Sequence, residues 1–280
     1  MTATVRQAVD SAAAKFRAAG CPSHGSGRDA ELLLMQVLGC GLAELLTHPE
    51  RALSPAESAQ YESLVTRRLQ AEPMQYIAGE QEFFGLSFRV TRDVLIPRPE
   101  TEHLVEALLE RVLIGAAVRV VDVGTGSGAI AVALAHALPR SQVTAVDSSP
   151  AALAVARQNA ERHLVSGRIR FLLSNLLTAV NGESFDAVVS NPPYIGENEL
   201  LEPQVRGYEP RSALYAGPTG LEIYERLVPE AQGVLKPGGW LIMEIGHGQK
   251  AALLRLLENW EDVRFADDLQ GIPRVAIARR

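Results

Sequence analysis

The run Val120–Ala129 constrains the fold most, because an apolar stretch leads directly into a glycine-rich turn. Its sequence is Val-Val-Asp-Val-Gly-Thr-Gly-Ser-Gly-Ala, and the helical pattern Ile130–Ala135 follows. This order of strand, glycine turn and helix opens the nucleotide-binding α/β unit. Glycine lets the backbone approach a ligand closely, and the helix N-terminus points N–H groups at it. We therefore predict an α/β sheet with a ligand-binding turn at Gly124, Thr125, Gly126, Ser127 and Gly128.

An acidic residue follows this turn at a distance typical of such units. The run 142–147 is predicted to be the next strand and ends in Asp147, about 20 residues after the turn. A carboxylate at that place can accept hydrogen bonds from both hydroxyls of a ribose. The alternative role for Asp147 is a cap or an N-terminal charge of the next helix. Because Gly124-x-Gly126-x-x-Ala129 also fits the dinucleotide fingerprint, NAD and S-adenosylmethionine both stay open as ligands.

A second motif, Asn191-Pro192-Pro193-Tyr194, follows the strand-like run 185–190. Prolines cannot donate backbone hydrogen bonds, so the strand has to end here and a stiff, extended loop begins. The side-chain carbonyl of Asn191 and the backbone carbonyl of Pro192 can together accept both N–H bonds of a planar –NH₂ group, and Tyr194 can lie against its face. We predict that all four residues bind the substrate and that Asn191, Pro192 and Tyr194 are catalytic. The alternative is a plain proline-rich turn.

Longer segments accompany the two motifs. They are Leu-Ile-Pro-Arg-Pro-Glu-Thr-Glu at 95–102, Gln-Tyr-Ile-x-Gly at 75–79, Phe-Phe-Gly-Leu-x-Phe-x-Val at 83–90, Tyr-Glu-Pro-Arg-x-Ala-Leu at 208–214 and Asp-x-x-Gly-Ile-x-Arg-Val at 268–275. With them the chain resembles the bacterial release factor glutamine N5-methyltransferases, a family of class I S-adenosylmethionine-dependent methyltransferases. The segments at 75–79 and 83–90 of this chain look like the interdomain hairpin of that family. The motif at 191–194 alone is shared with adenine N6-methyltransferases, whereas the segments at 95–102 and 208–214 are far more specific.

The resemblance implies a fold, a reaction and a set of binding residues. The fold is α/β, a Rossmann-like class I methyltransferase sheet with a small N-terminal helical bundle and a connecting β-hairpin. The reaction transfers a methyl group from S-adenosyl-L-methionine to the side-chain amide nitrogen (N5) of the glutamine in the Gly-Gly-Gln motif of class I peptide chain release factors, which modulates translation termination. The residues implied in cofactor binding are Gly124, Thr125, Gly126, Ser127, Gly128, Asp147, Asn175, Leu176 and Asn191.

Two positions depart from the family pattern. Asn175 stands where the family usually has an aspartate that accepts from the adenine amino group. Its side-chain oxygen can still accept, but without the added strength of a charged acceptor, so we expect weaker cofactor binding. Thr219 stands where aspartate is common, and there we expect a local change of turn or cap without a change of activity.

The sequence predicts three parts along the chain. Residues 1–74 form a helical bundle, which by the resemblance recognises the release factor; residues 75–97 form a hairpin linker; and residues 98–280 form the methyltransferase domain. Within the bundle, Ser54-Pro55-Ala56-Glu57 is a capping box with proline at the first helical position, so a helix is expected from there to about Gln70.

Strands and helices alternate in the last part, which predicts a mainly parallel sheet covered by helices on both faces. The predicted strands are 118–123, 142–147, 168–173, 185–190, 239–245, 263–266 and 274–279. The last two follow each other closely, so we expect them to form an antiparallel hairpin at one edge. Gly124, Asp147, Asn175 and Asn191 all follow strands. Because ligands bind at the carboxyl ends of such strands, one shared site is expected.

Composition narrows the function classes. The net charge of −6 over 280 residues argues against a broad basic surface, and we expect no direct nucleic-acid partner. No apolar stretch reaches the ~20 residues that span a membrane, and no signal peptide is visible, so a cytoplasmic enzyme without a membrane partner is expected. No His, Cys and Asp cluster has metal-ligand spacing, which predicts no metal. Two alternatives stay open: methylation of a nucleic-acid base amino group through the same loop, and a non-catalytic protein that binds the cofactor.

Overall fold

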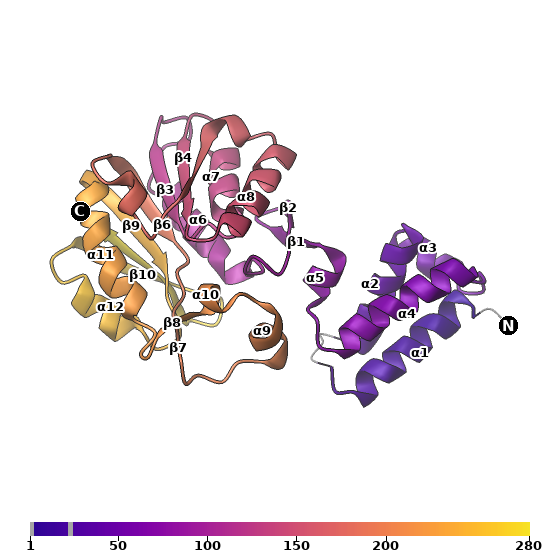
Figure 1. Cartoon of the computed structure of the whole chain (residues 1–280). Coiled ribbons are helices and arrows are strands. Elements are labelled where there is room, and N and C mark those ends of the chain that lie inside the picture. Colours follow the sequence, from indigo (N-terminus) through magenta and orange to yellow (C-terminus); the bar gives the residue numbers. More distant parts are fainter. Residues whose placement is uncertain (1–2, 22–24) are drawn as a thin grey trace. The chain divides into compact units, whose positions relative to one another are not determined.

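The computed structural model describes residues 3–21 and 25–280, which divide into two structural units (Figure 1). One unit comprises Met1–Gly79 and Leu201–Tyr208, and the other comprises Glu80–Leu200 and Glu209–Arg280. The helices of the first unit are α1 (Val5–Ala18), α2 (Ser26–Leu38), α3 (Leu42–Thr47), α4 (Pro55–Leu69), α5 (Met74–Ala78) and α9 (Pro203–Tyr208).

Helix α4 begins at the capping box that the sequence predicts. The Ser54 hydroxyl accepts from the Glu57 backbone N–H at 3.2 Å, and the Glu57 carboxylate accepts from the Ser54 N–H at 2.7 Å. The predicted helix is confirmed and ends at Leu69. The apolar faces of α1, α2 and α4 meet in one core that contains Phe16, Leu33, Leu34, Tyr61 and Val65. Burying each large apolar side chain contributes roughly 1.5–3 kcal/mol.

A short hairpin opens the second unit. Strands β1 (Glu80–Phe83) and β2 (Leu86–Arg89) pair antiparallel around Phe84 and Gly85, whose φ angles are +52° and +71°. Two successive positive φ angles are typical of the tight turns that match strand twist. The expected hairpin character of 75–79 is wrong, because residues 74–78 form helix α5, which ends at Gly79 in the left-handed conformation. The strand pattern therefore starts only at Glu80.

The rest of the second unit is an α/β sheet with its helices. Its strands are β3 (Arg119–Val123), β4 (Gln142–Asp147), β5 (Ile169–Leu173), β6 (Phe185–Ser190), β7 (Ile195–Gly196), β8 (Tyr215–Gly217), β9 (Leu235–Glu244), β10 (Glu261–Asp267) and β11 (Pro273–Arg279). Its α-helices are α6 (Glu102–Leu109), α7 (Ala129–Ala137), α8 (Pro150–Arg162), α10 (Arg211–Leu214), α11 (Glu222–Val234) and α12 (Lys250–Leu256), with 3₁₀ turns at Pro99–Thr101, Ser166–Arg168 and Thr178–Val180.

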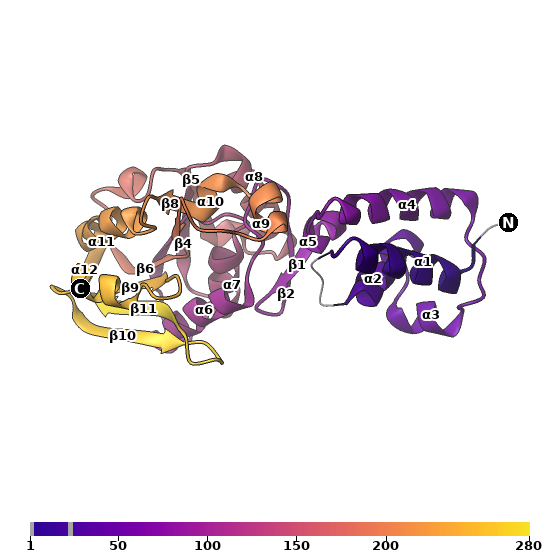
Figure 2. The ribbon, with the colours of Figure 1, turned by 90° about the horizontal axis from the view of Figure 1, so that it is seen from below.

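Seven of these strands form one sheet in the order β10-β11-β9-β6-β3-β4-β5. Strands β5, β4, β3, β6 and β9 are parallel, and β11 pairs antiparallel with both β9 and β10. The predicted antiparallel pair at one edge is confirmed, and Figure 2 shows it in yellow. Strand β9 starts earlier than expected, because Leu235 already pairs with Phe185 before a register shift at the Pro237–Gly239 segment.

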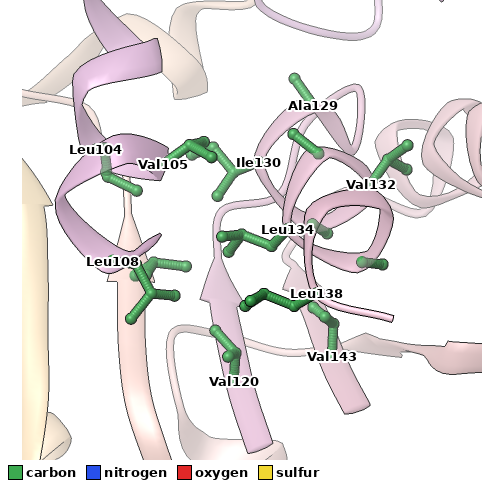
Figure 3. Packing of buried hydrophobic residues seen from close by; sticks show 14 of the residues in the cluster. Leu104, Val105, Leu108, Val120, Ala129, Ile130, Val132, Leu134, Leu138 and Val143 are labelled. Atoms are coloured by element: carbon green, nitrogen blue, oxygen red, sulfur yellow. The ribbon is translucent and has the colours of Figure 1, made fainter. Parts of the chain in front are cut away.

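Helices cover both faces of this sheet. Helices α6, α7 and α8 bury side chains on one face, and α11 and α12 on the other. Figure 3 shows Leu108 of α6 and Leu134 of α7 packed over Val120 and Val143 of the strands. Strand order reverses between β3 and β6, since the chain moves outward through β4 and β5 and then returns. At such a switch point the loops after the strands diverge and leave a crevice for a ligand.

Candidate active site

A pocket lies at the carboxyl ends of β3, β4, β5 and β6. It collects most of the residues that the sequence singles out. The predicted residues that line it are Gly124, Thr125, Gly126, Ser127, Asp147, Asn175, Leu176, Asn191, Pro192 and Pro193. Gly128 and Tyr194 are absent from its lining. The strand-end segments thus meet in space as expected.

The glycine turn combines an open cradle with one tight packing contact. Gly124 and Gly126 have φ angles of +74° and +55°, and a Cβ on Gly124 would meet no atom within 4 Å. The backbone here can therefore approach a ligand directly. Gly128 differs, because a Cβ there would lie 3.0 Å from the Ala156 Cβ of α8. A glycine is required at position 128 because φ is +81° and because α8 packs too closely for a side chain.

Asp147 ties the end of β4 to the glycine turn. Its Oδ2 accepts from the Gly126 backbone N–H at 2.9 Å, and its Oδ1 accepts from the Ser149 N–H at 2.8 Å. A carboxylate has about four acceptor sites, so each oxygen keeps a further lone pair. Ser149, rather than Asp147, caps α8, since its hydroxyl accepts from the Ala152 N–H.

Asp122 lies beneath the turn. Its side chain is fully buried, and Oδ2 accepts from the Thr125 hydroxyl at 2.7 Å. Burial raises the pKa of Asp122 to about 7, although the Thr125 hydrogen bond opposes this shift. The contact supports a structural role for Asp122 in fixing the turn.

This raised pKa predicts a pH-dependent stability. In the unfolded chain an aspartate titrates near its ordinary pKa of about 3.9. Between that value and about 7 the folded protein binds the proton more tightly, so Asp122 stabilises the fold less as pH rises. We expect the difference in unfolding free energy between wild type and Asp122→Asn to change by on the order of 1 kcal/mol per pH unit from pH 5 to 7. Denaturant unfolding at each pH measures it, and parallel pH curves for the two proteins would contradict the prediction.

Asn175 is already engaged by another side chain. Its Oδ1 accepts from the Arg226 guanidinium of α11 at 2.9 Å. The neighbouring Ser174 hydroxyl donates to the Leu176 carbonyl at 2.7 Å, and Leu176 has a φ of +49°. The segment is thus held in a tight turn beside the pocket, and the Asn175 oxygen shares its lone pairs with a cation.

The loop after β6 is held by a buried hydrogen-bond chain. The Asn191 amide Nδ2 donates to the Thr101 hydroxyl at 3.0 Å, and Thr101 donates to Oε2 of Glu244 at 2.5 Å. The Tyr194 hydroxyl donates to the other Glu244 oxygen at 3.2 Å. Burial, helped by the Glu244 charge, raises the pKa of Tyr194, which keeps its phenol protonated as a donor. Tyr194 thus points at Glu244, and the Gln249 side chain donates to its backbone carbonyl at 2.9 Å.

Two family-like segments are joined by an ion pair beside this chain. Arg98 donates to Oε1 of Glu209, and the Ile96 backbone N–H donates to Oε2 of the same carboxylate at 3.2 Å. The Glu209 side chain is buried. The proline-rich segment 95–102 and the segment 208–214 were notable in the sequence only by resemblance, and no local pattern indicates that Glu209 anchors one to the other.

Thr101 and Glu244 are the residues of this site that sequence reasoning assigned least well. Thr101 stood out in the sequence only as part of the family-like segment 95–102, and Glu244 had no expected role. Residues Asp93, Val94 and Leu95 also line the pocket without having been expected there. Among the described residues, no group of three or more His, Cys, Asp or Glu could hold a metal ion. Over the same residues, no helix has the length and apolar character to cross a membrane.

Solved structures of methyltransferases have a similar fold. The chain is similar to a methyltransferase from Pyrococcus furiosus, with a TM-score of 0.52, 20% identity and coverage of 70% of this chain and 90% of that one. It is also similar to the Thermus thermophilus 16S rRNA N2 G1207 methyltransferase solved with AdoMet and guanosine, with a TM-score of 0.55, 22% identity and coverage of 72% and 49%. At these identities the likeness shows the methyltransferase fold, which confirms the predicted fold class.

Sequence comparisons are more specific. Residues 7–79 match the PrmC N-terminal domain, and residues 99–203 match the methyltransferase small domain. The release factor glutamine methyltransferase of Koribacter versatilis is 47% identical over 280 residues, covering 99% of each chain. Those of Geobacter sulfurreducens and Salmonella typhimurium are 46% and 41% identical, covering 90% of this chain and 88% and 91% of theirs. With this identity along nearly its whole length, the chain belongs to the release factor glutamine methyltransferase family.

Proposed function

We propose that the protein transfers a methyl group from S-adenosyl-L-methionine to N5 of the glutamine in the Gly-Gly-Gln motif of class I peptide chain release factors, and so modulates translation termination. The observation that carries the proposal is the orientation of Asn191. Its Nδ2 donates to Thr101, so Oδ1 is the end of the amide left to accept from a substrate –NH₂. A glutamine side chain offers such a group.

The pocket fits the cofactor. The cradle at Gly124 and Gly126 has room for a ligand against the backbone, and the remaining lone pairs of Asp147 can accept from ribose hydroxyls. Thr125, Ser127, Asn175 and Leu176 line the same pocket, and Asn175 and Leu176 would face the adenine of the cofactor. Gly128 would act indirectly, by letting α7 and α8 pack closely behind the turn. When bound, the cofactor supplies a methyl group made electrophilic by its sulfonium sulfur.

The chain's own residues would position the substrate nitrogen. An amide nitrogen is a weak nucleophile because its lone pair is delocalised, so alignment has to supply much of the rate enhancement, up to ~7–11 kcal/mol in ideal cases. Hydrogen bonds from the substrate N–H groups to Asn191 Oδ1 and the Pro192 carbonyl also favour the positive charge that develops on nitrogen. Pro193 keeps the loop extended, and Tyr194 holds its far end through Glu244.

The division of labour follows the domains that the sequence predicts. We assign residues 1–74 to recognition of the release factor and 98–280 to methyl transfer. The predicted linker 75–97 comprises most of helix α5, which belongs to the first unit, and the β1–β2 hairpin, which belongs to the second. Release factors act in the cytoplasm, where we place the enzyme, and we assign it no direct nucleic-acid partner.

Transfer of labelled methyl from S-adenosylmethionine to a purified class I release factor tests the proposal. We expect label on the intact factor and none on a factor whose Gly-Gly-Gln glutamine is replaced by alanine. Duplex DNA and ribosomal RNA serve as competing acceptors. Label on nucleic acid instead would assign the enzyme to base methylation. Absence of label on every acceptor, despite cofactor binding, would reject the proposed reaction.

Asp147→Asn should weaken cofactor binding by about 10- to 100-fold, the loss expected from hydrogen bonds to a charged acceptor. An asparagine has one side-chain oxygen, so it cannot serve Gly126, Ser149 and a ribose together. Isothermal titration calorimetry with S-adenosylmethionine measures the Kd. The matched control is Asp10→Asn, which removes the same charge from an exposed position of α1. Equal Kd values for the two variants would exclude Asp147 as a ligand of the cofactor.

A further inference from the structure

Glu244 lies beside the substrate loop because of strand register. It is the last residue of β9, whose Met243 pairs with Ser190, the last residue of β6. Asn191 and Glu244 are therefore the next residues along two adjacent parallel strands. Glu244 is 2% exposed, at the carboxyl end of β9. In the reaction proposed above, Glu244 enters only as the acceptor of the Tyr194 hydrogen bond.

The hydrogen bonds to Glu244 come from neutral donors. One carboxylate oxygen accepts from Thr101 and the other from Tyr194. Burial of the carboxylate raises the pKa of Glu244, and these two hydrogen bonds oppose that shift. Burying a charge is costly, and the hydrogen bonds that this carboxylate accepts from the described residues come from two hydroxyl groups, so a role beyond packing is expected for it.

The direction of each hydrogen bond follows from the acceptor character of a carboxylate. In its ionised form this carboxylate can only accept, and in that form the single proton of the Thr101 hydroxyl points at Glu244. The lone pairs of Thr101 then face Asn191, which has to turn its –NH₂ end toward them. The hydrogen bonds around an asparagine determine which end of its amide points where. Here Glu244 orients the Thr101 hydroxyl, and Thr101 in turn orients the Asn191 amide.

We infer that Glu244 is a positioning residue whose carboxylate, acting through Thr101, fixes the Asn191 amide with Oδ1 directed at the substrate and, acting through Tyr194, holds the far end of the same loop. A reversed Asn191 amide would present N–H donors to the N–H donors of a glutamine side chain. Glu244 would therefore set which end of Asn191 meets the substrate, without touching the substrate itself. This inference rests on the proposed glutamine methylation for its catalytic consequence.

Four variants separate this role from simple packing. Thr101→Val keeps the shape of the side chain and removes the hydroxyl. Thr101→Ser keeps the hydroxyl and removes only the methyl group. Glu244→Gln keeps the shape but has one acceptor oxygen for two donors. The fourth variant combines Thr101→Val with Glu244→Gln, and Glu258→Gln at an exposed position is the matched control. Circular dichroism and thermal unfolding select folded proteins.

We expect Thr101→Val and Glu244→Gln each to lower kcat for the release factor by up to about 10²-fold, the loss that misplacement by ~1 Å can cause, with a much smaller change in KM for the cofactor. Thr101→Ser should recover most of the kcat. Because both residues act in one chain, the double variant should lose no more than the more severe single variant. The inference would be overturned if the kcat loss of the double variant equalled the product of the two single losses, or if either single variant kept the wild-type kcat.

A substrate-free measurement decides the orientation itself. The side-chain amide signal of Asn191 can be assigned by NMR from its loss in Asn191→Ala. We expect its hydrogen exchange to be about 5- to 10-fold faster in Thr101→Val and in Glu244→Gln than in wild type, as a hydrogen bond of ordinary strength is lost or weakened. Unchanged exchange in both variants would refute the positioning role. If the wild-type enzyme left the release factor unlabelled, the proposed function would fail, and this measurement would still decide the inference.

Discussion

Asn191→Ala should lower kcat for release factor methylation by about 10²–10³-fold, the loss typical of removing one preorganised polar contact to the transition state. The substitution removes Oδ1, the oxygen that the Thr101 contact leaves for the substrate. It also removes the donor to Thr101, whose hydroxyl keeps its bond to Glu244. The fold should persist, because Asn191 is only partly buried and follows the end of β6.

Steady-state kinetics with a release factor and thermal unfolding together test this expectation. Binding of S-adenosylmethionine, measured by calorimetry, should change far less than kcat, since the glycine cradle and Asp147 are untouched. Asn181→Ala is the matched control, because it removes an exposed asparagine from a turn outside the pocket. A folded Asn191→Ala enzyme with the turnover of the control would remove the basis for the proposed mechanism.

The sequence predicts this site well where its parts are local. Strand, turn and helix patterns placed Gly124, Asp147 and Asn191 at strand ends, and parallel strands bring their carboxyl ends to one edge. The capping box at Ser54 likewise fixed the start of α4 within a few neighbouring residues. Such features depend on spacing along the chain, which a single sequence displays.

Features that depend on distant partners were beyond sequence reasoning. Thr101 and Glu244 are 143 residues apart in sequence, and Glu244 lies beside Asn191 because β9 pairs with β6. Arg226 of α11 donates a hydrogen bond to Asn175, and no local sequence pattern predicts this contact. Gly128 belongs to a motif of ligand-binding glycines, yet its own constraint is the Ala156 side chain of another helix.

The second large effect concerns a glycine outside the motifs that the sequence emphasises. Gly220 has a φ of +80°, and a Cβ there would lie 2.5 Å from the backbone carbonyl oxygen of Tyr194 and 3.1 Å from the Gly196 nitrogen. Both neighbours are backbone atoms, which cannot rotate away as a side chain can. The Gln249 side chain also donates to the backbone carbonyls of Tyr194 and Gly220, so hydrogen bonds hold together the segments that contain these three residues.

Gly220→Ala should therefore displace the loop that carries Asn191. Left-handed backbone strain costs an alanine roughly 1–2 kcal/mol, and the clash adds roughly 1–3 kcal/mol. Because a shift of about 1 Å at reacting groups can cost 10²-fold, we expect kcat to fall by about that factor in the protein that remains folded. Gly182→Ala is the matched control, since Gly182 has a φ of +84° but a Cβ added there would meet no atom within 4 Å. It should share the strain and keep its turnover. Equal stability and equal kcat for the two variants would mean that the loop yields to the added methyl group, and that its position is not held by the Gly220 contact.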